Sequence, residues 1–133
     1  MSPEAESAGR SESPPLLALH KVQAGLTFGA TNYPPQRLTK LIEKLTQAGI
    51  AFRLSFDDGY RHLADFLPPL MEEFKLSPLV FVPTALIGET NRWDYSHFLR
   101  PMRHLDRDSI RNLARLGVRI GSHGHTHRDL TAL

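Results

Sequence analysis

The stretch IAFRLSFDDG, residues 50–59, decides the fold, because it joins a short apolar run to two carboxylates and a glycine. A second stretch of the same kind, VRIGSHGHTH at residues 118–127, joins an apolar run to three histidines. Side chains at the ends of two strands can meet only if the strands run parallel in one sheet. Together the two stretches predict a parallel sheet with a polar site at the carboxyl ends of its strands.

Short apolar runs alternate with longer amphipathic runs along the rest of the chain, which predicts an α/β fold of parallel strands and alternating helices. The predicted strands are residues 16–20, 50–56, 79–82 and 118–120, and the predicted helices are residues 35–48, 60–74 and 107–116. Pro68 and Pro69 are expected to kink the second helix or to split it. Residues 83–105 are expected to form a long irregular connection of the kind that often faces a substrate.

Composition narrows the class of protein. The chain has 133 residues, of which 41% are hydrophobic and 23% charged, as is typical of one globular domain. A formal charge of +2 does not indicate nucleic acid as a partner, and no apolar stretch is long enough to span a membrane. Because the chain has no cysteine, any metal must be held by histidine, aspartate or glutamate.

The first fifteen residues are polar and rich in serine, glutamate and proline, so residues 1–15 are interpreted as a disordered lead-in to a domain over residues 16–133. The apolar run at residues 16–19 is too short for the core of a signal peptide. This favours a cytoplasmic location, and secretion stays open if the native N-terminus is altered.

Asp57 and Asp58 suit a metal-assisted reaction, because adjacent carboxylates point in different directions. One can bind a metal while the other stands beside it as a base, and Gly59 permits a tight turn close to a ligand. The alternative is an ordinary turn that follows a strand.

His123 and His127 share a face if they enter a helical turn, and two histidines at this spacing are a common metal clamp. In an extended conformation His125 shares the face as well, so the pattern leaves it open as a ligand. The alternative is a set of polar residues in a terminal loop.

Residues 55–60 (SFDDGY) and 120–130 (IGSHGHTHRDL) resemble the first two motifs of the polysaccharide deacetylases, also known as the NodB homology domain or carbohydrate esterase family 4. Residues 19–22 (LHKV) and 81–84 (FVPT) are similar to the entry strand and the third strand of that family. The resemblance implies the first half of a distorted (β/α)7 barrel, truncated after the second motif.

The resemblance also implies an activity, namely hydrolysis of a carbon–nitrogen bond that removes N-acetyl groups from carbohydrate such as N-acetylglucosamine-containing glycans. By position, it makes Asp57 the general base and assigns a divalent metal, most often Zn²⁺, to Asp58, His123 and His127. His125 has no role in this assignment. Trp93 and His20 are candidates for substrate binding, with packing as the alternative for both.

The chain departs from the family pattern in two places. Gly124 stands where the family has serine or threonine, so a hydroxyl that could brace the histidine loop is missing, and metal affinity is expected to fall modestly. The sequence given ends at Leu133, before the family's Arg-containing third motif and its late histidine. Four parallel strands would leave an exposed edge, to be covered by self-association or by a missing C-terminal half.

Three further interpretations stay open. The chain could be a catalytically incomplete module that binds metal or sugar, or a hydrolase of another linear amide. It could also be a plain α/β domain whose aspartates and histidines serve only turns and loops.

Overall fold

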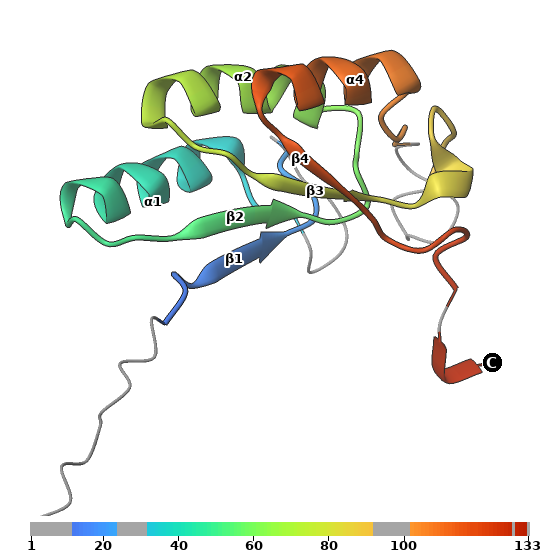
Figure 1. Ribbon diagram of the computed structural model, residues 1–133, viewed down its shortest axis with the longest axis horizontal. Coiled ribbons are helices and arrows are strands. Elements are labelled where there is room, and N and C mark those ends of the chain that lie inside the picture. The colour runs from blue at the N-terminus through green and yellow to red at the C-terminus, as the bar shows by residue number, and fades with distance from the viewer. Residues whose placement is uncertain (1–11, 24–31, 92–101, 129, 133) are drawn as a thin grey trace, which may run out of the picture.

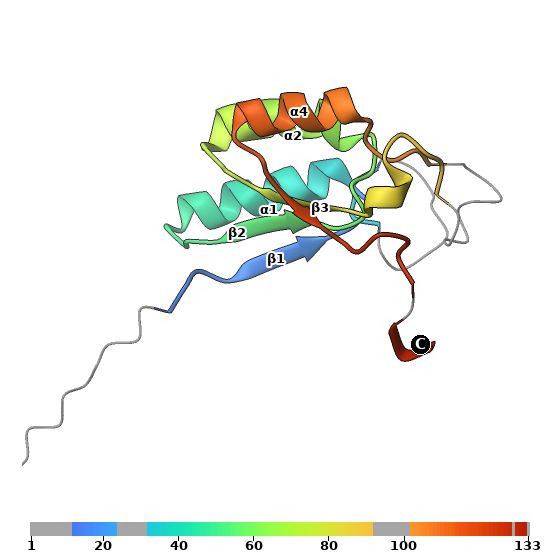
Figure 2. The same ribbon diagram turned by 45° about the vertical axis from the view of Figure 1, so that its right-hand side comes forward.

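Four short parallel strands form one sheet in the computed structural model, which describes residues 12–23, 32–91, 102–128 and 130–132. The strands lie side by side in chain order and are β1 (Leu16–Leu19), β2 (Arg53–Phe56), β3 (Leu79–Val82) and β4 (Arg119–Ser122). Each connection therefore crosses to the neighbouring strand in the same direction. Since such crossovers are right-handed, the helices gather on one face of the sheet (Figures 1 and 2). The predicted parallel α/β fold is confirmed.

In the described ranges, three α-helices cover this face, one short 3₁₀ helix follows β3, and a second follows the loop after β4. They are α1 (Pro35–Gln47), α2 (Leu63–Phe74), α4 (Arg107–Leu116), η1 (Thr84–Leu86) and η2 (Leu130–Ala132). Asp106 caps α4 by accepting a hydrogen bond of 2.8 Å from the backbone N–H of Ser109, and this bond lowers the pKa of Asp106. Gly117 ends the helix in the left-handed conformation, with φ of 106°.

Several predicted boundaries differ from the observed ones by one or two residues, and two elements begin three residues later than predicted. β2 begins at Arg53 rather than at residue 50, because β1 offers partners only from Leu16 onward. α2 begins at Leu63 rather than at residue 60, after the turn that follows β2. Pro68 and Pro69 lie inside α2, which is one helix, so of the two expected outcomes, a kink or a split, the split does not occur.

The hydrophobic core lies between the sheet and the helices. Side chains that alternate along the strands point toward the helices and are buried, and each large one contributes about 1.5–3 kcal/mol to stability. They pack against the apolar stripes of the three helices. The main members are Leu54, Phe56, Val80 and Val82 from the sheet, with Leu38, Ile42, Leu67, Leu70 and Leu113 from the helices.

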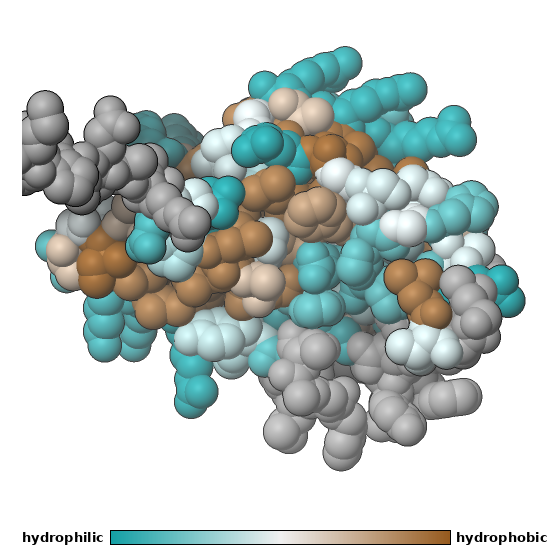
Figure 3. All heavy atoms as spheres, turned by 60° about the horizontal axis from the view of Figure 1, so that its bottom comes forward, coloured by the Kyte–Doolittle hydropathy of each residue, from teal (hydrophilic) through white to brown (hydrophobic). Residues whose placement is uncertain are grey.

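The opposite face of the sheet carries no helix in the described ranges. Figure 3, which brings this side of the molecule forward, shows a broad hydrophobic area on it. By register, Leu16, Ala18, Leu79 and Phe81 point to this side. The ring of Phe81 lies over Gly121, where an added Cβ would stand 2.6 Å from Phe81 Cδ1. β1 and β4 are the two edges of the sheet.

The described parts of the connection after β3 contain η1 and two isolated bridges. Tyr60 to His104 joins the connection to the turn after β2, and Thr90 to Arg103 joins its two described parts. Trp93 lies outside the described residues, as does most of the predicted lead-in at 1–15. Among the described helices, none is both long enough and apolar enough to cross a membrane.

Candidate metal centre

The turn after β2 directs Asp58 into the protein. Asp58 and Gly59 both adopt left-handed backbone, with φ of 68° and 52°. An aspartate tolerates this conformation better than most residues. At Gly59 an added Cβ would lie 2.5 Å from Val82 Cγ1, so the turn passes too close to β3 for a side chain. The result is a carboxylate-bearing residue that is only 4% exposed.

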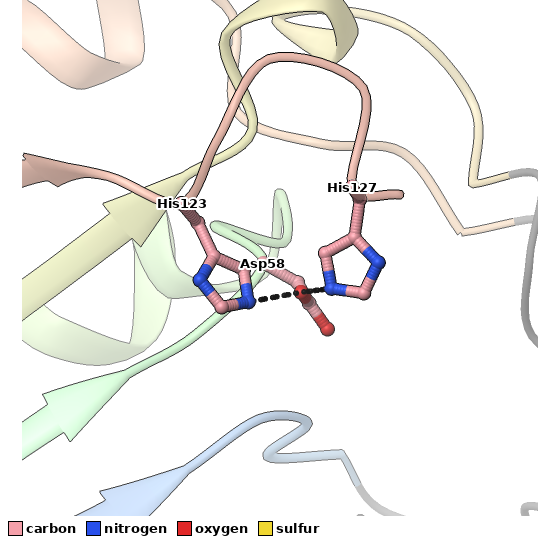
Figure 4. A group of neighbouring side chains, drawn as sticks. All are labelled: Asp58, His123 and His127. Carbon is pink, nitrogen blue, oxygen red and sulfur yellow. Dashed lines mark ion pairs between the residues drawn. The ribbon is translucent and has the colours of Figure 1, made fainter. Parts of the chain in front are cut away.

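The loop after β4 brings two histidines together. Its first residue, His123, still donates a backbone hydrogen bond of 2.8 Å to the carbonyl of Val82. The loop then bends at Gly124 and His127, which have φ of 74° and 55°, so it is not the helical turn considered from the spacing. The rings of His123 and His127 end 4.9 Å apart between centroids (Figure 4).

His125 points elsewhere. Its Nδ1 lies 2.9 Å from the hydroxyl of Thr84, and its carbonyl accepts a hydrogen bond of 2.8 Å from the backbone N–H of Ala85. The carbonyl of Gly124 likewise accepts a bond of 3.0 Å from the backbone N–H of Thr84. These contacts attach the histidine loop to the end of β3, although residue 124 lacks a hydroxyl.

Asp58, His123 and His127 converge on one point (Figure 4). Oδ1 of Asp58 lies 3.1 Å from Nε2 of His127 and 3.4 Å from Nε2 of His123. One ligand atom from each residue lies within 4.8 Å of the others, and they are the residues of the described chain that group in this way. The sequence pattern placed these three at the ends of two strands, and the structure brings them together from β2 and β4, across the end of β3.

This group fits a divalent metal. Oδ1 of Asp58 is buried, and no described residue donates a hydrogen bond to it. In a tetrahedral zinc site with bonds of about 2.0–2.2 Å, neighbouring ligand atoms stand roughly 3.4 Å apart, close to the two distances from Oδ1. His123 and His127 are partly exposed, which leaves one side of the group open to a small molecule. Nitrogen and oxygen ligands of this kind suit zinc and several other divalent metals.

Asp57 precedes Asp58 in the chain, and its side chain lies close to His20. The carboxylate of Asp57 is 23% exposed, in contrast to Asp58, and its Oδ2 lies 3.7 Å from Nε2 of His20. The backbone N–H of Asp57 donates 2.7 Å to the carbonyl of Leu19, which fixes the residue at the end of β2. Adjacent carboxylates thus divide into one that is buried and one that meets solvent.

Buried polar residues that the sequence analysis did not single out lie beneath Asp58. They are Lys21, Tyr60, Asn91 and His104. The hydroxyl of Tyr60 accepts 3.1 Å from the amide of Asn91. Burial raises the pKa of Tyr60, and the charge of Asp58 and a hydrogen bond with its carboxylate raise it further. Tyr60 therefore stays protonated and can donate to Asp58.

Lys21 adds a positive charge to this layer, with Nζ 6.0 Å from the centre of the Tyr60 ring. Burial lowers the pKa of Lys21, and attraction to Asp58 opposes that effect. Lys21, Asn91 and His104 come from separate segments as single polar positions, and no spacing in the sequence connects them with Asp58.

Comparison with known proteins identifies the class. Residues 44–133 match the family model described as polysaccharide deacetylase, which is more than half of the chain. The chain belongs to the polysaccharide deacetylase family. No curated protein matches the chain.

Solved structures of deacetylases share the fold. The deacetylase PplD of Streptococcus pyogenes, in complex with acetate, is 13% identical, with a TM-score of 0.67 over 88% of this chain and 58% of its own. IcaB from Ammonifex degensii is 17% identical, with a TM-score of 0.65 over 90% of this chain and 56% of its own. A polysaccharide deacetylase from Bacillus cereus is 15% identical, with a TM-score of 0.67 over 92% of this chain and 42% of its own. The chain thus spans about half the length of these proteins, in agreement with the predicted first half of a NodB-type barrel.

Proposed function

We propose that this chain is part of a metal-dependent hydrolase that removes N-acetyl groups from carbohydrate, such as glycans that contain N-acetylglucosamine. The observation that carries the proposal is the convergence of Asp58, His123 and His127 at the carboxyl ends of β2 and β4. Family membership supports the same reaction class. The structural neighbour PplD was solved with acetate, the acid that such a reaction releases.

In this proposal Asp58, His123 and His127 hold a divalent cation, and that cation is Zn²⁺. When bound, the cation would polarise the acyl carbonyl and lower the pKa of a coordinated water. Tyr60 orients the Asp58 carboxylate through a hydrogen bond, and the positive charge of Lys21 offsets its negative charge. Their burial keeps bulk water away from the inner side of the group.

Asp57 is the proposed general base. It is exposed enough to reach a water at the open side of the group, and it is held at the end of β2 by its backbone hydrogen bond. It would take the proton of the attacking water as the carbon–oxygen bond forms. His20 lies next to it and is proposed to contact the substrate or to steady the carboxylate. Trp93 stays a prediction as a second substrate-binding residue.

The amide carbon–nitrogen bond then breaks, and the sugar amine leaves with a proton. The family resemblance assigns that proton to a histidine later in the sequence than residue 133. We therefore propose that the complete activity belongs to a longer protein, whose remaining strands cover the outer edge of β4.

The first test is a calorimetric titration of zinc into the metal-free chain. We expect one zinc for each chain, with binding lost in Asp58→Asn and in His123→Ala. The matched control is His125→Ala, because His125 lies in the same loop but faces Thr84, and this variant should bind as the wild type does. Folded wild-type protein that binds no zinc would contradict the proposal.

The second test measures acetate released from oligomers of N-acetylglucosamine by zinc-loaded protein that includes the following strands. Release that requires Asp57 supports the proposed reaction. Zinc binding without any release, even in the longer protein, would favour the alternative of a binding module.

A further inference from the structure

Residues 103–105 pair with residues 59–61, which directly follow Asp58. The backbone N–H of Arg61 donates 2.8 Å to the carbonyl of Arg103, and the backbone N–H of Leu105 donates 2.8 Å to the carbonyl of Gly59. Between these two bonds, Tyr60 and His104 form an antiparallel bridge. The segment thus pairs with the turn that carries the metal ligand.

His104 adds a side-chain contact to this pairing. It is 2% exposed, and its Nδ1 lies 2.6 Å from the backbone carbonyl oxygen of Asp58. A carbonyl can only accept, so Nδ1 carries the hydrogen and donates it. The imidazole also stacks on the ring of Tyr60, with centroids 5.1 Å apart and planes at 19°. Its backbone N–H is fixed by a bond of 2.9 Å to the carbonyl of Glu89.

This contact acts on a strained position. Asp58 has φ of 68°, a conformation that costs an ordinary residue about 1–2 kcal/mol and that neighbouring structure must maintain. Relaxation of this φ would be a rotation about the N–Cα bond of Asp58, which moves the side chain and the carbonyl together. A donor that holds the carbonyl therefore also holds the direction of the carboxylate.

We propose that His104 is a positioning residue of the metal centre, whose Nδ1–H holds the Asp58 carbonyl and so keeps the Asp58 carboxylate aimed at His123 and His127. The inference rests on the proposed function, since it concerns the same metal group. It adds a residue that makes no contact with the metal and that belongs to neither of the two sequence motifs.

The test compares zinc affinities of the wild-type chain and three variants, measured by competition with a chromophoric chelator. His104→Leu removes the donor, and His104→Asn keeps an amide N–H near the position of Nδ1. His104→Gln is equally polar but carries its amide near the position of Nε2. We expect a loss of about 10-fold or more for Leu and Gln, the range seen when the partner of a metal ligand is removed, and a loss of less than about 3-fold for Asn.

The control for general destabilisation is Leu113→Ala, which empties a core position on α4 and should leave zinc affinity unchanged. Equal affinities for the Asn and Gln variants, or wild-type affinity for the Leu variant, would overturn the inference. The Asn and Gln pair decides the matter even if the Leu variant does not fold. Wild-type protein without zinc binding would instead overturn the metal centre itself, and with it the premise of the inference.

Discussion

Oδ1 of Asp58 and Nε2 of His127 stand 3.1 Å apart, although their strands, β2 and β4, are not neighbours in the sheet. The contact passes over the end of β3, where Gly59 lies against Val82. A metal held between these residues would therefore connect the first half of the described chain to its last strand.

Zinc is expected to stabilise the folded chain. At a free concentration 100 times the dissociation constant, a ligand that binds only the folded state adds about 2.7 kcal/mol to the free energy of unfolding. Urea denaturation with and without zinc measures this gain. The gain should vanish in Asp58→Asn and persist in His125→Ala, and an equal gain in all three proteins would show that zinc binds elsewhere.

Gly59→Ala is expected to disturb both stability and zinc binding. The added methyl meets left-handed strain of about 1–2 kcal/mol and a contact of 2.5 Å with Val82 Cγ1, which adds about 1–3 kcal/mol of overpacking. Gly49→Ala is the matched control, because Gly49 has φ of 66° but nothing within 4 Å of the added Cβ. Urea denaturation should find Gly59→Ala clearly less stable, and equal losses would mean that the contact with β3 is unimportant.

Asp57→Asn should separate binding from chemistry. Since Asp57 lies outside the group of three ligands, zinc affinity should stay within about 3-fold of the wild type. Acetate release by the longer zinc-loaded protein should fall by about 10²–10⁴-fold, the usual contribution of a general base. Asp65→Asn, at an exposed carboxylate on α2, is the control and should change neither quantity. Release that survives Asp57→Asn would assign the base elsewhere.

The free energy of unfolding should fall at acidic pH, because protonation of the buried His62 favours the unfolded chain. This residue accepts a hydrogen bond of 3.0 Å from the backbone N–H of Val22, and burial lowers its pKa from 6.5 to about 4. Because the unfolded chain takes up the proton first, the contribution of His62 is complete above pH 6.5 and is lost as the pH falls toward 4. The loss amounts to about 3 kcal/mol.

The free energy of unfolding measured between pH 7 and pH 4 checks this. His62→Gln keeps an acceptor for Val22 and should flatten the decline, whereas the exposed His125→Ala should leave it unchanged. His104, whose pKa is also lowered by burial, contributes to the remaining slope in the same direction. A wild-type slope in His62→Gln would show that His62 does not carry the effect.

Much of this molecule could be predicted from local patterns. The alternation of apolar and amphipathic runs gave the four strands and three helices, since each element buries one face. Asp58, His123 and His127 each follow a predicted strand, and parallel strands place their carboxyl ends at the same edge of a sheet. The sequence therefore predicted that these residues lie close together.

The missed features depend on contacts between distant segments. His104, Lys21 and Asn91 are single polar residues whose burial beneath Asp58 follows from the path of the chain and not from any spacing. The left-handed backbone of His127 was equally invisible, since the residue is not a glycine. Local propensity cannot report a conformation that tertiary packing imposes.

The position of β3 between the two ligand-bearing strands has a consequence for the order of assembly. During synthesis, the chain as far as Asp58 is made long before His123 and His127, and β3 must take its place before β4 can dock beside it. A bound metal would then join Asp58 to His123 and His127 and so link the end of β2 to the loop after β4. The metal would therefore bind last, and only to chains in which β2, β3 and β4 have already paired in this order.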